Sequence, residues 1–363
     1  MTTFEPPTID RRITATLLED PGRIPVVVGL CGSGRTSLLH RLAQAFGPRE
    51  TQYVNVERTA TTPERFLAAL TASSPFVDAG PAPPVTSPRQ AFDAVLAFFT
   101  IARRADNGPV TFLLDEVLEF RTFGSFPGLR RALPELLAVI AASPNRFVLT
   151  SRYPTRTERA LSGASPQFAV VPMPALPESE LSRVVTDAVA ARPSGAGDPA
   201  AAGVDAMARL VAAVSGGRPS YVRAIAGALA ARASDVLAQD PVAALASVLG
   251  PGAHLWSLCA FGYELRLHRA RGYGALKAIL EILSEQEPLT LTDISRRMGR
   301  TPGSTKDYLS WLEDVDLVSV HRKRYRFRDP MLRVWVRLYC HSTPPTAETI
   351  GSEVAQFAAA RLA

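Results

Sequence analysis

Lysine is nearly missing from this 363-residue chain. It occurs only at Lys277, Lys306 and Lys323, so the first 276 residues contain none. Arginine supplies almost all of the positive charge instead. A phosphate site in the first three quarters of the chain therefore has no lysine nearby in the sequence.

Cysteine and long apolar runs are also scarce. Cys31, Cys259 and Cys340 are too widely spaced for a disulfide framework or a metal site. No apolar run approaches the ~18–20 residues of a membrane span, and the N-terminus lacks the basic and apolar regions of a signal peptide. With 47% hydrophobic and 20% charged residues, we expect a soluble, cytoplasmic protein of two or three domains.

The net charge of +6 is unevenly distributed. Between Leu255 and Cys340, 15 arginine and lysine residues stand against 10 acidic residues. This excess indicates either an anionic partner for the C-terminal region or docking of that region on an acidic face of the same chain.

A glycine-rich segment, GLCGSGRTS at Gly29–Ser37, is the most informative motif. It fits the phosphate-loop pattern G-x-x-x-x-G-K-[ST], except that Arg35 replaces the lysine. An apolar strand precedes it and a helical pattern follows, which aims backbone N–H groups and a helix N-terminus at a phosphate chain. The alternative is a purely structural strand-to-helix turn. The predicted nucleotide-binding residues are Gly29, Gly32, Ser33, Gly34, Arg35, Thr36 and Ser37.

Arg35 limits the chemistry expected of this loop. Lysine is a compact charge that bridges the β- and γ-phosphates, whereas guanidinium is planar and larger. Arg35 can hold phosphate, even through two hydrogen bonds, but it cannot occupy the lysine position between the two groups. The sequence therefore predicts nucleotide binding with slow ATP hydrolysis.

Two carboxylates end an apolar run at Val110–Glu116. At the C-terminal end of a parallel strand, Asp115 can organise Mg²⁺ together with the Thr36 hydroxyl, and Glu116 can orient an attacking water. Such a strand end also occurs by chance, but the loop upstream favours the functional interpretation. Arg152, at the exit of the next strand, is predicted to sense a γ-phosphate; the alternative is a solvated loop arginine.

Alternating apolar strands and helical patterns predict an α/β fold, a P-loop parallel sheet covered on both faces. The predicted strands are 25–29, 52–56, 110–114, 147–150 and 168–171, with helices at 63–72, 88–103 and 129–142 and a surface loop at 73–87. A helical region at 178–247, interrupted at 195–202 and 216–219, predicts a lid. Helices at 275–283, 291–298 and 304–315, followed by a hairpin of 317–320 with 325–327, predict a winged helix. The predicted domains are 1–175 (P-loop nucleotide-binding), 176–250 (helical lid), 251–345 (winged helix) and 346–363 (C-terminal helix).

The hairpin carries the basic run HRKRYRFR at His321–Arg328. Strand alternation turns Tyr325 and Phe327 inward and leaves the arginines, Arg328 included, on the outer face. With short polar residues opening the preceding helix, this pattern favours binding of double-stranded DNA. Acidic residues later in that helix favour a protein partner or internal packing instead. The predicted DNA-binding residues are Ser304, Thr305, Lys306, Arg322, Lys323, Arg324 and Arg326.

On these motifs the chain resembles the STAND branch of the AAA+-like P-loop ATPases, in particular the archaeal-type ATPases. The similarity covers about residues 24–337. It includes the loop at 29–36, the Asp115-Glu116 pair, the 149–152 strand exit, the segment 174–181, the Gly217-Arg-Pro219 motif and the ending at 325–335. It implies a switch that closes around ADP and opens or assembles with Mg-ATP as a nucleotide-dependent homo-oligomer, with Pro219 near the adenine. Arg35 departs from the family pattern and puts hydrolysis in doubt.

Three functions remain open from sequence. The first is an ATP/ADP-binding STAND-type switch with weak ATPase activity and a winged-helix output domain. The second is a DNA-binding regulator, or partner of a DNA-associated ATPase, that only senses nucleotide. The third is a scaffold whose degenerate loop binds no nucleotide, which is favoured if Arg35 fills the phosphate cavity.

Overall fold

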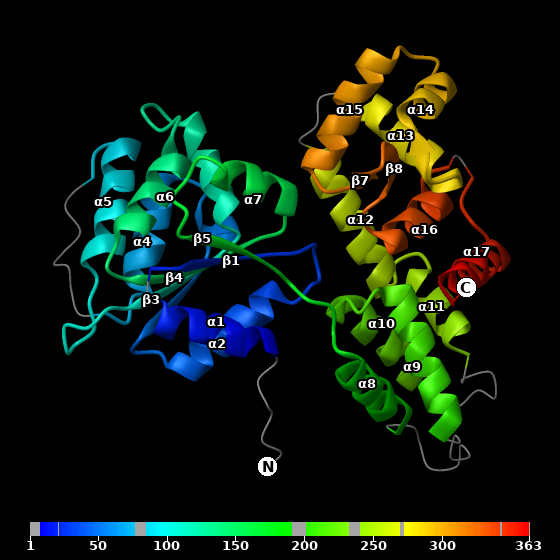
Figure 1. Cartoon of the computed structure of the whole chain (residues 1–363), viewed down its shortest axis with the longest axis horizontal. Helices are drawn as coiled ribbons and strands as arrows, with labels where there is room; N and C mark the ends of the chain where they lie inside the picture. Colours follow the sequence, from blue (N-terminus) through cyan, green and yellow to red (C-terminus); the bar gives the residue numbers. More distant parts are fainter. Residues whose placement is uncertain are drawn as a thin grey trace. The chain divides into compact units, whose positions relative to one another are not determined.

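The computed structural model describes residues 8–20, 22–76, 85–190, 201–231, 240–268, 272–341 and 343–362. The chain forms two compact units, Met1–Pro174 and Ala175–Ala363 (Figure 1). Among the described residues, no single helix is long and apolar enough to cross a membrane; only the bent pair Pro241–Leu249 and His254–Leu267 reaches that length and composition together.

The first unit is built on a five-stranded parallel sheet in the order β2-β3-β4-β1-β5. Every strand that the sequence predicts for this sheet is present, and each strand end lies within one residue of the predicted position. The prediction succeeds because a sheet buried on both faces is encoded by continuous apolar runs. The strands are β1 (Ile24–Val28), β2 (Thr51–Asn55), β3 (Thr111–Asp115), β4 (Arg146–Ser151) and β5 (Phe168–Pro172).

Helices cover both faces of this sheet (Figure 1). Strand side chains alternate, so Val27 packs with the helices of one face and Val26 with those of the other. The first face is covered by α1 (Thr8–Glu19) and α2 (Arg35–Phe46). The opposite face is covered by α4 (Pro63–Ala72), α5 (Pro88–Ile101) and α6 (Ala132–Ala142). Three short helices directly follow β2, β3 and β4: α3 (Val56–Thr59), η1 (Val117–Ser125) and α7 (Pro154–Leu161).

The second unit is mainly helical. The region predicted as a lid contains α8 (Glu178–Ala190), α9 (Ala201–Ser215), α10 (Pro219–Ala231) and α11 (Pro241–Leu249). Next come α12 (His254–Leu267), α13 (Tyr273–Glu285), β6 (Leu289–Thr290), α14 (Leu291–Met298) and α15 (Pro302–Asp314). The hairpin β7 (Val318–His321) and β8 (Arg324–Phe327), with β6, forms a sheet in the order β6-β8-β7, and α16 (Pro330–Tyr339) and α17 (Ala347–Leu362) end the chain.

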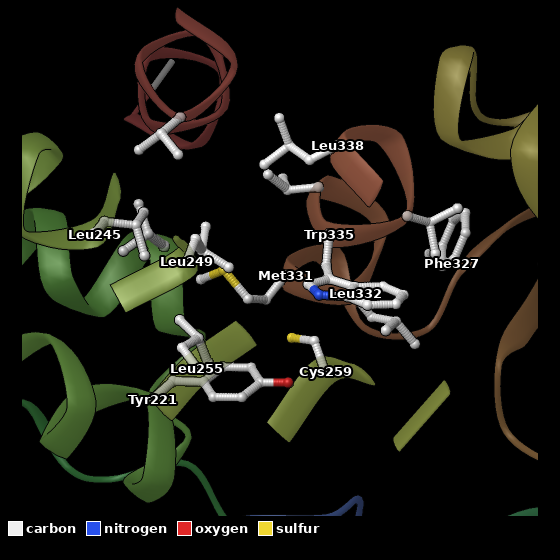
Figure 2. Packing of buried hydrophobic residues seen from close by; sticks show 14 of the residues in the cluster. Tyr221, Leu245, Leu249, Leu255, Cys259, Phe327, Met331, Leu332, Trp335 and Leu338 are labelled. Carbon is white, nitrogen blue, oxygen red and sulfur yellow. The ribbon is translucent and has the colours of Figure 1, made fainter. Parts of the chain in front are cut away.

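One continuous hydrophobic core joins these helices from α8 to α17. Figure 2 shows Leu249 of α11, Cys259 of α12 and Met331 of α16 within the same cluster. Trp335 of α16 packs on Trp256 with ring centroids 6.4 Å apart. The core contains residues from both sides of the predicted domain boundaries at 250 and 345. The finer division of this unit into lid, winged helix and terminal helix therefore stays a prediction.

Several helices were not predicted from the sequence, among them α1, α12 and α16. In α1 the buried residues Ile9, Ile13 and Leu17 recur every four residues, a pattern typical of an amphipathic helix. The predicted interruption at 195–202 and the centre of the predicted loop at 73–87 lie largely outside the described residues.

Candidate functional site

The glycine-rich loop connects β1 to α2. Gly32 and Gly34 adopt φ angles of 78° and 95°, which strongly favour glycine. Gly29 needs to be glycine for space, because a Cβ atom there would lie 2.7 Å from Ser33 Oγ. Glycine is therefore favoured at three positions of this loop. Ser37 follows in the first turn of α2 and is half-buried.

The Arg35 side chain folds back onto this loop and is only 7% exposed. Its Nη1 donates to the carbonyl oxygens of Gly29 and Leu30, the latter at 2.8 Å, and to Ser33 Oγ at 3.1 Å. Its Nη2 donates to Glu116 Oε1 at 2.6 Å. In this structure the guanidinium is bound to the loop's own acceptors and to a carboxylate.

Glu116 lies directly after β3 in an unusual conformation. Its φ angle of 64° is left-handed, which is uncommon for a non-glycine residue and often marks a functional site. In this conformation its N–H group donates to Thr150 Oγ1 at 3.0 Å. Its Oε2 accepts from the backbone N–H of Arg152 at 2.9 Å, so Arg35 and Arg152 hold the carboxylate from two sides.

Burial alone would raise the pKa of Glu116, but the charges of Arg35 and Arg152 and their hydrogen bonds hold it below the ordinary value of 4.5. The group is thus an ionised carboxylate with both oxygens engaged. A carboxylate with a lowered pKa is a poor general base at neutral pH.

Arg152 is buried, with 5% exposure, so the alternative of a solvated loop arginine is wrong. It pairs with Glu57 of α3 as well as with Glu116. Burial acts to lower the pKa of Arg152, and the charges of Glu116 and Glu57 outweigh it and raise the pKa. Successive ion pairs thus connect four side chains of alternating charge, in the order Arg35, Glu116, Arg152 and Glu57.

Asp115 and Thr36 meet at the same edge of the sheet. Thr36 Oγ1 donates to Asp115 Oδ2 at 2.7 Å, and Asp115 is 1% exposed. Thr150 Oγ1 and Tyr53 OH also donate to this carboxylate, at 2.5 and 3.0 Å. Burial, and then the Asp115 charge, raise the pKa of Tyr53 to about 12, which keeps it protonated as a donor.

The side chains at this edge of the sheet fit one common mode of Mg²⁺ binding. In the part of the chain that the structure describes, no three His, Cys, Asp or Glu side chains gather as a metal site. Mg²⁺ is commonly held by one or two carboxylates together with water and substrate phosphates. The hydroxyl of Thr36 and the carboxylate of Asp115 fit that mode, and they are the residues that would hold the ion.

Three members of this site were missed in the sequence: Tyr53, Glu57 and Thr150. Thr150 is the last residue of the strand that was predicted just before Arg152. Tyr53 and Glu57 belong to β2 and α3, and β2 pairs with β3 so that Asn55 lies beside Asp115. Strand adjacency of this kind requires the sheet order, which the local sequence pattern does not give.

The Gly217-Arg-Pro219 motif belongs to the second unit. Pro219 is buried and begins α10, and its contact with nucleotide stays a prediction. Arg218, which was not predicted as a functional residue, forms an ion pair with buried Asp329. Tyr221 OH also donates to Asp329, at 2.6 Å.

The predicted DNA-binding residues divide into two groups. Lys306 and the four basic residues of the hairpin are exposed, and Ser304 is half-buried. The prediction for Thr305 is wrong, because its side chain is fully buried and donates to the carbonyl oxygen of Thr301 at 3.0 Å. Arg328 does not share the open face either, since it pairs with buried Asp316.

Comparison with solved structures assigns the fold. The Walker-type ATPase PABY2304 of Pyrococcus abyssi is 15% identical, with a TM-score of 0.66 over 92% of this chain and 96% of that one. The origin recognition complex of Drosophila bound to DNA (15% identity, 87% and 90% coverage, TM-score 0.41) and the AAA domain of FIGL-1 in complex with ADP (14%, 70% and 81%, 0.39) are much less similar. No protein-family model and no curated protein sequence matches the chain. The first unit thus has the fold of the P-loop ATPases.

Proposed function

We propose that this protein binds ADP and ATP with Mg²⁺ through Gly29–Ser37 and hydrolyses ATP slowly. The observation that carries the proposal is the Thr36–Asp115 hydrogen bond at the end of a glycine-rich loop. When bound, Mg²⁺ would neutralise phosphate charge at these two residues. Slow hydrolysis follows from Arg35, because a planar guanidinium cannot take the position of a lysine ammonium group between the β- and γ-phosphates. Calorimetric titration with ADP and ATP tests binding; no binding at millimolar nucleotide would favour the scaffold alternative.

The proposal includes a STAND-type switch with nucleotide-dependent self-association and an output region at 251–345. One part of this proposal, the mechanical link between the predicted lid and the output region, is supported by the shared core of α8 to α17. Close-packed interiors transmit strain, so a displacement of α10, which begins at Pro219, would affect the helices packed against it.

Replacing Arg35 with lysine is expected to raise ATP turnover about tenfold or more, because lysine can lie between the β- and γ-oxygens, where charge shifts in the transition state. Phosphate release under single-turnover conditions measures this. Adding Asp115→Ala should remove the gain, since the metal would lose a ligand.

One result with these variants would contradict the prediction of slow hydrolysis. Rapid turnover by the native protein that falls in Arg35→Lys would mean that the site is adapted to arginine. Slow hydrolysis would then have to be abandoned.

A second candidate function is binding of double-stranded DNA by the hairpin. The β7–β8 turn consists of Arg322 and Lys323, both in left-handed conformation at φ 48° and 63°. Two-residue turns of this type favour Asn-Gly, so two long basic side chains here carry a conformational cost. That cost, together with the exposure of Arg324 and Arg326, favours a role in contacting an anionic partner.

If the hairpin contacts four phosphates, the affinity for duplex DNA should fall with salt at a log–log slope of about −3.6. Arg324→Ala/Arg326→Ala should reduce the slope to about −1.8. The matched control is Arg12→Ala/Arg23→Ala, which removes two exposed arginines from the first unit. Fluorescence anisotropy across a salt series provides the measurement. Equal losses in both double variants would indicate a general charge effect, and absence of binding at low salt would leave a protein partner.

A further inference from the structure

Arg35 stands where phosphate-loop proteins carry a lysine, and here Nη1 and Nη2 of its guanidinium already donate to protein acceptors, whereas its buried Nε has no acceptor. Three of its acceptors belong to the loop itself: the carbonyl oxygens of Gly29 and Leu30 and Ser33 Oγ. The fourth is the carboxylate of Glu116, 81 residues away in the sequence. Arg35 therefore connects the loop to the end of β3.

A phosphate chain held by this loop would need the same N–H groups. Carboxylate and phosphate are the two anions to which arginine donates most strongly, so they compete for Nη2 of Arg35. The side chains of Arg35 and Glu116 are only 7% and 8% exposed, and solvent and salt screen such a pair little. A phosphate that accepts from Nη2 must displace the Glu116 carboxylate that is already in place there.

Resting on the nucleotide site proposed above, we propose that the Arg35–Glu116 ion pair is an autoinhibitory contact. Glu116 holds the guanidinium in the loop of the ligand-free protein, and a phosphate chain binds by replacing the Glu116 carboxylate as the anion that faces Arg35. Nucleotide binding then releases Glu116 Oε1.

Arg152 gives this exchange a defined end point. Its backbone N–H donates to Oε2, the other oxygen of Glu116, at 2.9 Å, and its guanidinium is held by Glu57. Losing Arg35 therefore frees one carboxylate oxygen while the other stays anchored. The released oxygen remains at the end of β3, next to Asp115.

The test is the affinity for ADP, which avoids any contribution from hydrolysis. Glu116→Gln keeps the size of the side chain but removes the charge that holds Arg35. If the pair closes the loop nine-tenths of the time or more, the variant should bind ADP about tenfold more tightly than the wild type. In an Arg35→Ala background, Glu116→Gln should raise the ADP affinity by less than about a third of that factor. The guanidinium that Glu116 restrains is then absent.

Glu116→Asp provides a second variant that keeps the negative charge. Aspartate tolerates the left-handed backbone of position 116, and its shorter side chain draws the carboxylate away from Arg35. Binding should tighten several-fold here as well. Asp10→Asn is the matched control, because it breaks the Arg41–Asp10 pair of 2.6 Å elsewhere in the same unit and should leave ADP affinity unchanged. Thermal unfolding without ligand checks that each protein is folded.

The outcomes separate the two proposals. Equal tightening by Glu116→Gln with and without Arg35, or tightening by Glu116→Gln but not by Glu116→Asp, would mean simple charge repulsion and would overturn the autoinhibitory contact. Unchanged affinity in the Glu116 variants would overturn it too, while nucleotide binding itself stands. If neither the wild type nor any variant binds ADP, the proposed function fails and the contact fails with it.

Discussion

Replacing Gly34 with valine is expected to weaken binding of ADP and ATP by about 100-fold. Gly34 has φ 95° and ψ 13° and immediately precedes α2. A β-branched residue does not tolerate this conformation, so the loop would have to change its path at the point where it delivers Arg35 and Thr36. A strain of about 3 kcal/mol corresponds to a loss of about 100-fold in affinity. Isothermal calorimetry with Mg-ADP measures it.

Gly47→Val is the matched control for this prediction. Gly47 ends the same helix with φ 87°, and a Cβ atom there would meet nothing within 4 Å. Both substitutions strain one end of α2, but only Gly34 belongs to the loop. Gly47→Val should lower the melting temperature and leave ADP affinity intact. Wild-type affinity in Gly34→Val would show that the loop does not hold the phosphates.

Asp329→Ala is expected to lower the free energy of unfolding by about 3 kcal/mol, because it leaves the largely buried Arg218 guanidinium without its anion. Asp329 is 4% exposed and pairs with Arg218. It also caps α16, accepting from the N–H groups of Met331 and Leu332. Both residues pack into the core shown in Figure 2. Urea denaturation followed by circular dichroism measures the loss.

Asp240→Ala separates the cap from the ion pair. Asp240 caps α11 through the N–H of Val242 at 2.8 Å but is exposed, so its loss should cost only about 1 kcal/mol. An Asp329→Ala protein no less stable than Asp240→Ala would mean that the Arg218 pair contributes nothing.

The pH dependence of the Asp329 effect has a definite sign. Burial would raise the pKa of Asp329, but the charge of Arg218 and the hydrogen bonds from Tyr221 and Arg218 hold it below the ordinary 3.8. A lowered folded-state pKa gives stability that is present at neutral pH and is lost as the pH falls through that value. The gap between wild type and Asp329→Ala should therefore persist down to about pH 4 and close in stronger acid.

Local sequence patterns predicted the sheet and the loop well, because both are encoded by neighbouring residues. Apolar runs such as Ile24–Val28 identify buried strands wherever they occur, and glycine spacing identifies the loop. The Asp115–Thr36 contact was also predictable, since parallel strands share a carboxyl edge and a helix begins there.

The pairing of Arg35 with Glu116 was not predictable in the same way. It depends on the rotamer of a long side chain and on the left-handed backbone of Glu116, neither of which has a sequence signature. Arg328 illustrates the same limit. Strand alternation predicted that Arg328 lies on the outer face, but its guanidinium pairs with Asp316, a buried carboxylate after α15.

The aromatic cluster around Trp335 has a spectroscopic consequence. All three tryptophans of the chain, Trp256, Trp311 and Trp335, lie in the second unit, whereas the phosphate loop lies in the first. No tryptophan therefore belongs to the unit that carries the loop. A change in tryptophan emission on adding nucleotide would therefore show that the second unit senses a ligand of the first, and the indole rings of Trp256 and Trp335, which contact each other edge to face, are its built-in reporters.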